Sequence, residues 1–311
     1  MQSFVEIMTC LAIPRSGVPT TLKSLEIKGT FQITTGHCYH SLESLEIWDE
    51  SDSPWSFPLE SYPKLKSLRV RESKTLESLF ASEESYRDVS SLTYLMIWCS
   101  PNFVSFFSGG ICAPNLTAIT INNCNKLKSL PENMRTLLPS LEFLAVGECP
   151  ELESFPEGGL PLNLETLSIW ECDKLFSRRM GWGLQDLHSL KDINISSKCK
   201  EVESFPEEAW LPPTLTDITI GNFQYSKKKS IYFPNLKSLK GFQRLTSLEC
   251  LYIDGCPKLQ YLPEEGLPTL LSSLILINCP LLGQRCEREK GEEWPKIAQI
   301  SNVVIDEELI T

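Results

Sequence analysis

Residues 141–163 read LEFLAVGECPELESFPEGGLPLN, and the same pattern starts again at Leu164. The unit opens with a leucine, two variable residues, an aliphatic residue, one variable residue and a second aliphatic residue, here Leu141, Leu144 and Val146. Eleven such units follow one another along the 311 residues, at intervals of 20 to 33 residues. Their leading residues are Leu22, Leu42, Leu65, Leu92, Leu116, Leu141, Leu164, Leu190, Leu215, Leu248 and Leu271. This self-similarity predicts one long repeat array in which each unit packs on its neighbours.

Each unit divides into a strand and a return segment. Leu144 and Val146 alternate with outward residues as in a strand, and Pro150 ends the strand because proline cannot donate to a ladder. Leu152 and Phe155 then turn inward again, before a path rich in proline and glycine leads to the next unit. Equivalent apolar pairs occur at Leu76/Leu79, Phe103/Phe106, Leu127/Leu130, Val202/Phe205 and Leu259/Leu262. This layout resembles a leucine-rich repeat. It predicts an α/β solenoid of about 11–12 repeats, a horseshoe with a parallel β-sheet on the concave face and mostly irregular or 3₁₀ returns on the convex face.

We expect the leucine-rich-repeat solenoid to cover residues 1–282 and a C-terminal cap to cover residues 283–311. Cys10 and Leu11 resemble the back half of a repeat, so the array is expected to start mid-repeat with further chain ahead of it. Exposed apolar ends are a liability in a solenoid, and the cap carries apolar side chains that suit the open face of the last repeat. These are Trp294, Ile297, Ile300 and Ile305.

The unit between Leu215 and Leu248 is the longest, and its irregular part covers residues 221–247. Residues 223–233 are polar, basic and aromatic, and we interpret them as an insertion that reflects length variation rather than a binding loop. Apolar residues then recur every three positions, which predicts a helical or 3₁₀ segment on the outer curve. They are Leu236, Leu239, Phe242 and Leu245.

Twelve cysteines would suit a secreted disulfide protein, but their positions favour a different role. Five of them occupy one repeat position, eight residues after the leading leucine: Cys124, Cys149, Cys172, Cys256 and Cys279. A small side chain with a weak S–H donor suits the buried turn that follows each strand. Stacked repeats would hold successive thiols of Cys124, Cys149 and Cys172 about 5 Å apart, a spacing that permits disulfides without requiring them. We interpret the five cysteines as a structural ladder of free thiols in a reducing compartment. No metal site is expected, because His37, Cys38 and His40 lack a matching second pair of ligands.

The outward side chains of the predicted strands form columns, and solenoids commonly bind partners on such columns. One column contains Trp48, Arg71 and Trp98 in successive units, so Arg71 is expected between two indole rings in a cation–π arrangement. Exposed tryptophan and arginine often dominate the energy of protein interfaces. The candidate partner-binding residues on the concave face are Trp48, Arg69, Arg71, Met96, Trp98, Trp170 and Tyr252. The alternative is that the rings lie flat on the sheet and only cover aliphatic neighbours.

Several function classes are disfavoured by composition. A net charge of −11 argues against binding nucleic acid, which requires a basic surface. No run of 18 apolar residues exists, so no membrane span is expected. The chain contains three histidines and none of the phosphate-loop, nucleophile-elbow or kinase motifs, so we do not expect an enzyme.

The detailed form of the repeat narrows the family. Residues 148–170 and 254–274, with Cys-Pro after the strand and Gly-Leu-Pro before the next one, resemble the repeats of plant intracellular nucleotide-binding leucine-rich-repeat immune receptors of the coiled-coil class. The tail from Cys279 to Ile300 resembles the end of those receptors. The resemblance implies a cytoplasmic or also nuclear, non-secreted recognition and autoregulatory module in defence against pathogens. Its partner would be a pathogen effector, a guarded host protein or the receptor's own nucleotide-binding domain.

In that family ADP or ATP binds to a domain upstream of the repeats, so no cofactor is expected in this chain. A truncated protein, a decoy or a fragment of a longer receptor would each fit the sequence. Two other classes remain as alternatives. The first is the substrate-recognition part of an F-box-type ubiquitin-ligase adaptor, which would need an F-box ahead of these residues. The second is an extracellular receptor ectodomain, whose typical Leu-x-Gly-x-Ile-Pro repeats and paired cap cysteines are not found here.

Overall fold

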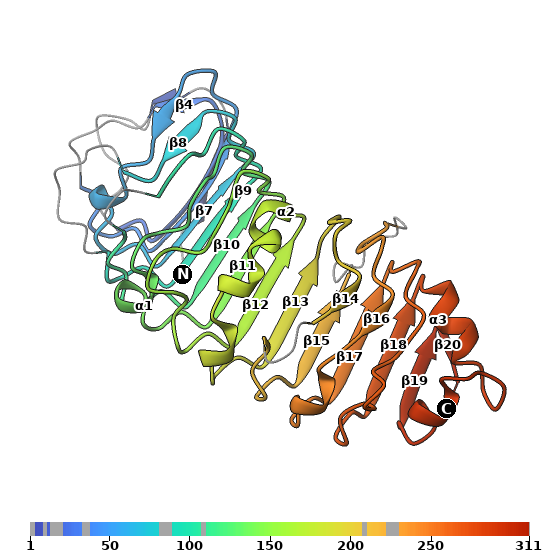
Figure 1. The fold of residues 1–311 in the computed structure, drawn as a ribbon. Helices are drawn as coiled ribbons and strands as arrows, with labels where there is room; N and C mark the ends of the chain where they lie inside the picture. The colour runs from blue at the N-terminus through green and yellow to red at the C-terminus, as the bar shows by residue number, and fades with distance from the viewer. Residues whose placement is uncertain are drawn as a thin grey trace. The chain divides into compact units, whose positions relative to one another are not determined.

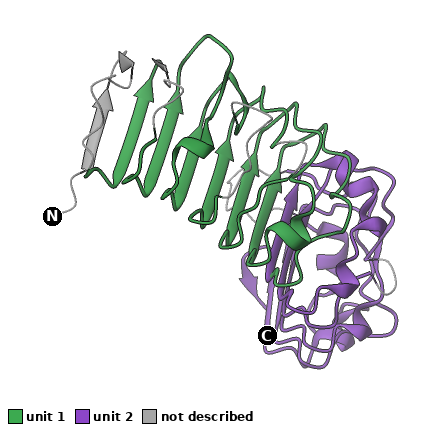
Figure 2. Ribbon diagram, turned by 90° about the vertical axis from the view of Figure 1, so that its left-hand side faces the viewer, with its two compact units in different colours: residues 1–164 green, residues 165–311 purple. Residues whose placement is uncertain are grey.

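A computed structural model of the chain describes residues 4–8, 11–12, 21–32, 38–80, 89–106, 110–206, 210–221 and 230–310, with the backbone only at residues 4–8, 11–12 and 31–32. The chain divides into two compact units, Met1–Leu164 and Glu165–Thr311, which Figure 2 shows in different colours. Each unit is described by itself.

The first unit contains a parallel β-sheet in which strands adjacent in the sheet come from successive repeats (Figure 1). The order is β1 (Phe4–Met8), β3 (Ser24–Gly29), β5 (Ser44–Asp49), β7 (Ser67–Arg71), β9 (Tyr94–Trp98), β10 (Ala118–Asn122) and β11 (Phe143–Gly147). Each pair is in register, so that Leu45 of β5 lies opposite Leu68 of β7. Strand β1 was not identified in the sequence, because Gln2 stands where its leading leucine would be.

The second unit is built in the same way. Its parallel strands are β12 (Thr166–Trp170), β13 (Asp192–Ser196), β15 (Asp217–Ile220), β17 (Cys250–Asp254), β18 (Ser273–Ile277) and β19 (Asn302–Ile305). A two-residue strand, β20 (Glu308–Leu309), pairs antiparallel with β19. The sheet therefore continues beyond residue 282, into the segment where a cap was expected.

The leading leucines hold the repeats together. All eleven retain at most 5% of their surface, and the two aliphatic residues that follow each of them are buried as well. Burying one leucine contributes roughly 1.5–3 kcal/mol relative to leaving it in water. Because this contribution repeats with the period of the sequence, the inward side of each strand is fixed and the alternate side chains face outward. The expected α/β leucine-rich-repeat solenoid with a parallel sheet is confirmed.

The returns contain short elements, as the sequence predicts. Paired two- and three-residue strands are β2 (Leu11–Ala12), β4 (Phe31–Gln32), β6 (Trp55–Ser56), β8 (Leu76–Ser78), β14 (Ser204–Phe205) and β16 (Ser238–Leu239). Helical turns are η1 (Leu59–Ser61), η2 (Arg179–Gly181), η3 (Leu184–Asp186), η4 (Phe242–Arg244), α1 (Met134–Leu137) and α2 (Asp173–Ser177). The apolar return pairs are buried, except that Phe155 is half-buried.

In the irregular unit, the four apolar residues at three-residue spacing are all buried. Phe242 opens the 3₁₀ turn η4, whereas Leu239 lies in the short strand β16. Residues 222–229, which form most of the expected insertion, lie outside the described residues.

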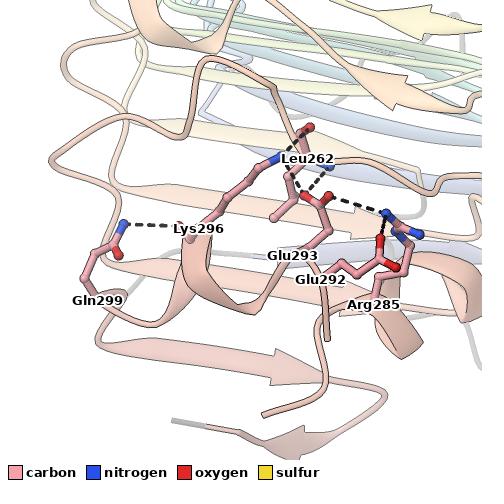
Figure 3. A network of polar contacts seen from close by, with 6 residues as sticks. All are labelled: Leu262, Arg285, Glu292, Glu293, Lys296 and Gln299. Carbon is pink, nitrogen blue, oxygen red and sulfur yellow. Dashed lines mark hydrogen bonds and ion pairs between the residues drawn. The ribbon is translucent and has the colours of Figure 1, made fainter. Parts of the chain in front are cut away.

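The C-terminal segment contains α3 (Pro280–Arg285) and α4 (Trp294–Ile297) ahead of β19. Ile297 and Ile300 are buried, while Trp294 and Ile305 are half-buried. A polar network attaches this segment to an earlier return (Figure 3). Glu293, only 4% exposed, accepts the main-chain N–H of Leu262 at 3.2 Å and pairs with Lys296 at 2.9 Å. Arg285 lies 3.9 Å from the same carboxylate and also pairs with Glu292.

Candidate protein-binding face

The outward side chains of β3, β5, β7 and β9 form a group of aromatic and charged residues in the first unit, which we call the β3–β9 face. It comprises Glu26, Lys28, Glu46, Trp48, Arg69, Arg71, Tyr94, Met96 and Trp98. All nine are half-buried, as expected for side chains that stand side by side on strands about 4.8 Å apart. In the middle and last outward columns β10 and β11 carry smaller residues, of which Thr120, Asn122 and Ala145 are at most 9% exposed. In the first column, Phe143 of β11 is large and 37% exposed. Among the strands of this unit whose side chains the structure describes, the accessible large side chains of the middle and last columns are therefore those of β3–β9.

Trp48 lies between two cations. Register places Lys28 on one side of it and Arg71 on the other. The Lys28 ammonium is 6.0 Å from the centroid of the indole, and the Arg71 guanidinium carbon is 5.1 Å from it. Each such contact contributes about 0.5–1 kcal/mol at an exposed position.

The expected sandwich of Arg71 between two indoles is wrong. Arg71 lies over Trp48 and, among the described residues, makes no matching contact with Trp98. The reason is the carboxylate of Glu46, which accepts the Arg71 Nε–H at 2.8 Å from the β5 side. That bond draws the guanidinium toward β5, and hence toward the Trp48 ring, away from β9.

Both flanking cations are paired with carboxylates on the same face. Lys28 lies 3.0 Å from Glu26, its neighbour two residues earlier on β3. Partly exposed ion pairs of this kind contribute about 0–1 kcal/mol, so their main effect is to orient the side chains. The indole Nε1 of Trp48 is covered and has no hydrogen-bond partner, which fixes this ring as a support rather than as a donor to a partner.

Arg69 and Tyr94 form a second cation–π pair. The Arg69 guanidinium carbon is 4.6 Å from the centroid of the tyrosine ring, and its Nη1 donates to Ser67 at 3.0 Å. Register places Met96 next to Arg69, and Trp98 next to Arg71. Arg69, Met96 and Trp98 therefore lie together on β7 and β9.

The two remaining candidates lie in the second unit. Tyr252 of β17 is half-buried and lies opposite Ile275 of β18. Trp170 of β12 retains only 8% exposure, so the expectation of a solvent-facing indole is wrong at this position. Its neighbours Ser168 and Ser196 are 3% exposed, which fits a wide ring that lies down over small side chains.

The five ladder cysteines are buried, with at most 2% exposure, and carry free thiols. Four of them donate to the main-chain carbonyl two residues earlier: Cys124 to Asn122 (3.5 Å), Cys149 to Gly147 (3.2 Å), Cys256 to Asp254 (3.7 Å) and Cys279 to Ile277 (3.3 Å). The neighbouring Cys149 thiol and burial hold the pKa of Cys124 well above its usual range, and Cys279 and burial do the same for Cys256. A buried thiol with a raised pKa is a poor nucleophile, so Cys124 and Cys256 contribute to packing.

The residue before each ladder cysteine has a positive φ, between 49° and 71°. These residues are Asn123, Glu148, Glu171, Gly255 and Asn278. The left-handed conformation turns the chain away from the strand and directs the cysteine into the core.

Comparison with known proteins identifies the repeat type. The chain is 36% identical over 308 residues to a protein of Arabidopsis thaliana described as a disease resistance protein; the match covers 96% of this chain and 21% of that protein. Among solved structures, the leucine-rich-repeat domain of the type III effector XopL aligns with a TM-score of 0.51 and 20% identity, over 72% of this chain and 73% of that domain. No protein-family model matches the sequence. The chain is a leucine-rich-repeat domain of the type found in plant disease-resistance proteins.

In this resistance-type repeat domain, the outward columns of the sequence correctly place five candidate residues on neighbouring strands of the first unit: Trp48, Arg69, Arg71, Met96 and Trp98. They do not identify the residues that orient these five. Glu26, Lys28 and Glu46 occupy the same outward columns as the candidates, but acidic and lysine side chains rarely dominate interfaces. Tyr94 lies in the first outward column, which contributed no candidate. The sequence signal for Glu46 is its position opposite Arg69 in the register of two neighbouring strands, where opposite charges pair. The signal for Glu26 and Lys28 is their two-residue spacing on one outward side of a strand. Within the described ranges, no helix is long and apolar enough to cross a bilayer, and no cluster of three or more His, Cys, Asp or Glu side chains could hold a metal ion.

Proposed function

We propose that this chain is the protein-recognition part of a plant defence protein and that it binds its partner through the β3–β9 face. The observation that carries the proposal is the group of aromatic and cationic side chains on adjacent strands, including Arg69, Met96 and Trp98 together on β7 and β9. A packed set of this composition matches the residues that dominate protein interfaces. The similarity to a disease resistance protein supports the setting, and solenoids offer extended surfaces of this kind for binding.

We further propose that the chain belongs to an intracellular immune receptor of the nucleotide-binding class, in the cytoplasm or nucleus. The partner is then a pathogen effector, a guarded host protein or the receptor's own nucleotide-binding domain, and ADP or ATP binds to that other domain. The free, buried thiols of the ladder support a reducing compartment, since oxidising compartments favour disulfides. The chain spans about a fifth of its Arabidopsis relative, so the remaining parts of such a receptor would lie in other segments.

Substitution of Trp98 tests the proposed face. Trp48 is unsuitable, because its removal would also release Lys28 and Arg71. Wild-type chain and Trp98→Ala would each be used to capture proteins from plant leaf extracts, with and without pathogen treatment, followed by quantitative mass spectrometry. We expect Trp98→Ala to reduce the captured partner by about tenfold or more, the effect of losing an interface hot spot.

The matched control is Leu162→Ala, which truncates a side chain that is 50% exposed in the same unit but lies off this face. Both variants should unfold at the wild-type temperature. If folded Trp98→Ala captures the same proteins in the same amounts as the control, the β3–β9 face is not the binding surface.

A further inference from the structure

The β3–β9 face carries three cations and two carboxylates. Lys28 is paired with Glu26, and Arg71 is paired with Glu46. Arg69 is the third cation, and among the described residues no carboxylate lies within ion-pair distance of it. The face therefore keeps one positive charge that no carboxylate of the described residues neutralises, although the net charge of the whole chain is −11.

The carboxylate best placed to neutralise Arg69 is committed elsewhere. Glu46 lies directly opposite Arg69 in the register of β5 and β7, yet it accepts the Nε–H of Arg71 at 2.8 Å. Because the Glu46 carboxylate pairs with Arg71, the guanidinium of Arg69 remains available to a partner. Arg71 thus orients the face, whereas Arg69 can bind a partner.

Arg69 is held in position without being saturated. Its guanidinium stacks on Tyr94, and only Nη1 donates, to the neutral hydroxyl of Ser67. A guanidinium has five N–H donors in a fixed plane, and the remaining ones suit a two-point contact with a carboxylate. Stacking reduces the side-chain entropy that binding would otherwise cost.

We propose that the partner is a protein that presents an aspartate or glutamate carboxylate to Arg69, beside an apolar side chain that packs on Met96 and Trp98. The inference rests on the proposed function and names the chemistry of its partner. The registers of β7 and β9 place the apolar contact next to the charged one. A hydrophobic contact beside a charge-assisted hydrogen bond gives both affinity and orientation.

Peptide selection tests this chemistry without knowledge of the natural partner. A phage library of random 12-residue peptides would be selected on the whole chain in four forms: wild type, Arg69→Gln, Trp98→Ala and Arg135→Gln. Arg135 is an exposed arginine of the same unit on α1 and serves as the matched control. We expect peptides from wild type and Arg135→Gln to be enriched in acidic residues, close to an apolar residue, and this enrichment to disappear with Arg69→Gln.

One selected peptide is then synthesised with its acidic residue as Glu and as Gln. On wild type the Gln form should bind about tenfold more weakly, as for a charge-assisted hydrogen bond, and on Arg69→Gln the two forms should bind equally. Acidic enrichment that survives Arg69→Gln, selection of basic or neutral peptides, or recovery of no peptide would each overturn the inference. Competition by inorganic phosphate stronger than by acetate would assign Arg69 to a phosphate group instead.

The two proposals fail in different ways. If Trp98→Ala selects the same peptides as wild type, the aromatic part of the proposed face is wrong. If Trp98→Ala abolishes selection but acidic residues are not enriched on wild type, the face stands and the assignment of Arg69 falls.

Discussion

Asp192 and Asp217 place two carboxylates opposite each other on β13 and β15. Burial, and then the charge of Asp217, raise the pKa of Asp192 above 3.8, while a hydrogen bond from Asn194 acts in the opposite direction. A raised pKa in the folded state means that the folded chain binds the proton more tightly than the unfolded chain. The free energy of unfolding therefore falls as the pH rises through the interval above 3.8.

Asp217→Asn should stabilise the protein at neutral pH. Removing one of two like charges across a strand pair is expected to raise the free energy of unfolding by roughly 0.2–1 kcal/mol at pH 7. The gain should vanish near about pH 3, where carboxyl groups are protonated in both states. Urea unfolding at the two pH values measures it, with the exposed Glu201→Gln as the control. A gain that persists at low pH would show that charge repulsion is not its cause.

At the scale of the element, the return from β15 depends on a glycine at the strand end. Gly221 has φ +105°, and a Cβ built on it would lie 1.9 Å from the main-chain oxygen of Asp254 on β17. Because glycine has no Cβ, the chain can turn out of the sheet after β15 while β15 and β17 remain paired. Because the obstacle is backbone, it cannot move aside as a side chain would.

Gly221→Ala should be strongly destabilising, by about 3 kcal/mol or more. Gly158→Ala provides the comparison, since Gly158 also has a positive φ, +86°, but no heavy atom lies within 4 Å of the position of its Cβ. Its cost should be limited to the left-handed backbone penalty of about 1–2 kcal/mol. Thermal unfolding of both variants would separate the cost of the clash with Asp254 from the cost of the left-handed backbone. Equal losses of stability in the two variants would mean that the clash with Asp254 contributes nothing.

Most elements could be predicted from the sequence because one pattern repeats with its packing role intact. Strand β1 was missed because Val5 and Ile7 are not preceded by a leucine. The turn before Cys124 is suggested by Asn123, since asparagine tolerates the left-handed conformation, whereas Glu148 gives no such signal.

The candidate face was only partly predictable. Alternation fixes which way Trp48 and Trp170 project, but not whether the ring stands up or lies down on its neighbours. The position of Arg71 depends on Glu46, which could pair with either Arg69 or Arg71 and pairs with Arg71. Which of the two arginines it pairs with depends on side-chain geometry, and the sequence pattern does not contain that information.

At the scale of the whole molecule, each repeat is stabilised mainly by its contacts with neighbouring repeats, so a local substitution should destabilise the chain locally. Glu293 tests this at the C-terminal network of Figure 3, where its buried carboxylate meets Leu262, Lys296 and Arg285. Glu293→Gln removes the charge that compensates two cations and should cost about 1–3 kcal/mol, because Lys296 and Arg285 remain in contact with water and are not left as buried charges.

Hydrogen exchange followed by mass spectrometry would locate the loss. Exchange should accelerate most at β18, β19 and the return containing Leu262, and less in repeats farther along the second unit. Glu292→Gln is the matched control, because the Glu292 side chain is 75% exposed and its pairing with Arg285 is on the surface. Uniform acceleration along the whole unit would instead indicate a single cooperative block.

The antiparallel strand β20 has a consequence for self-association. A sheet that grows by one parallel strand per repeat presents an unpaired edge on which another chain can add, the route to fibrils. In the second unit β20 covers that edge of β19 with two residues, and the exposed carboxylates of Asp306, Glu307 and Glu308 surround it. An incoming strand would have to bring its backbone against this concentration of negative charge. We therefore expect these three carboxylates to disfavour the addition of another strand at this edge.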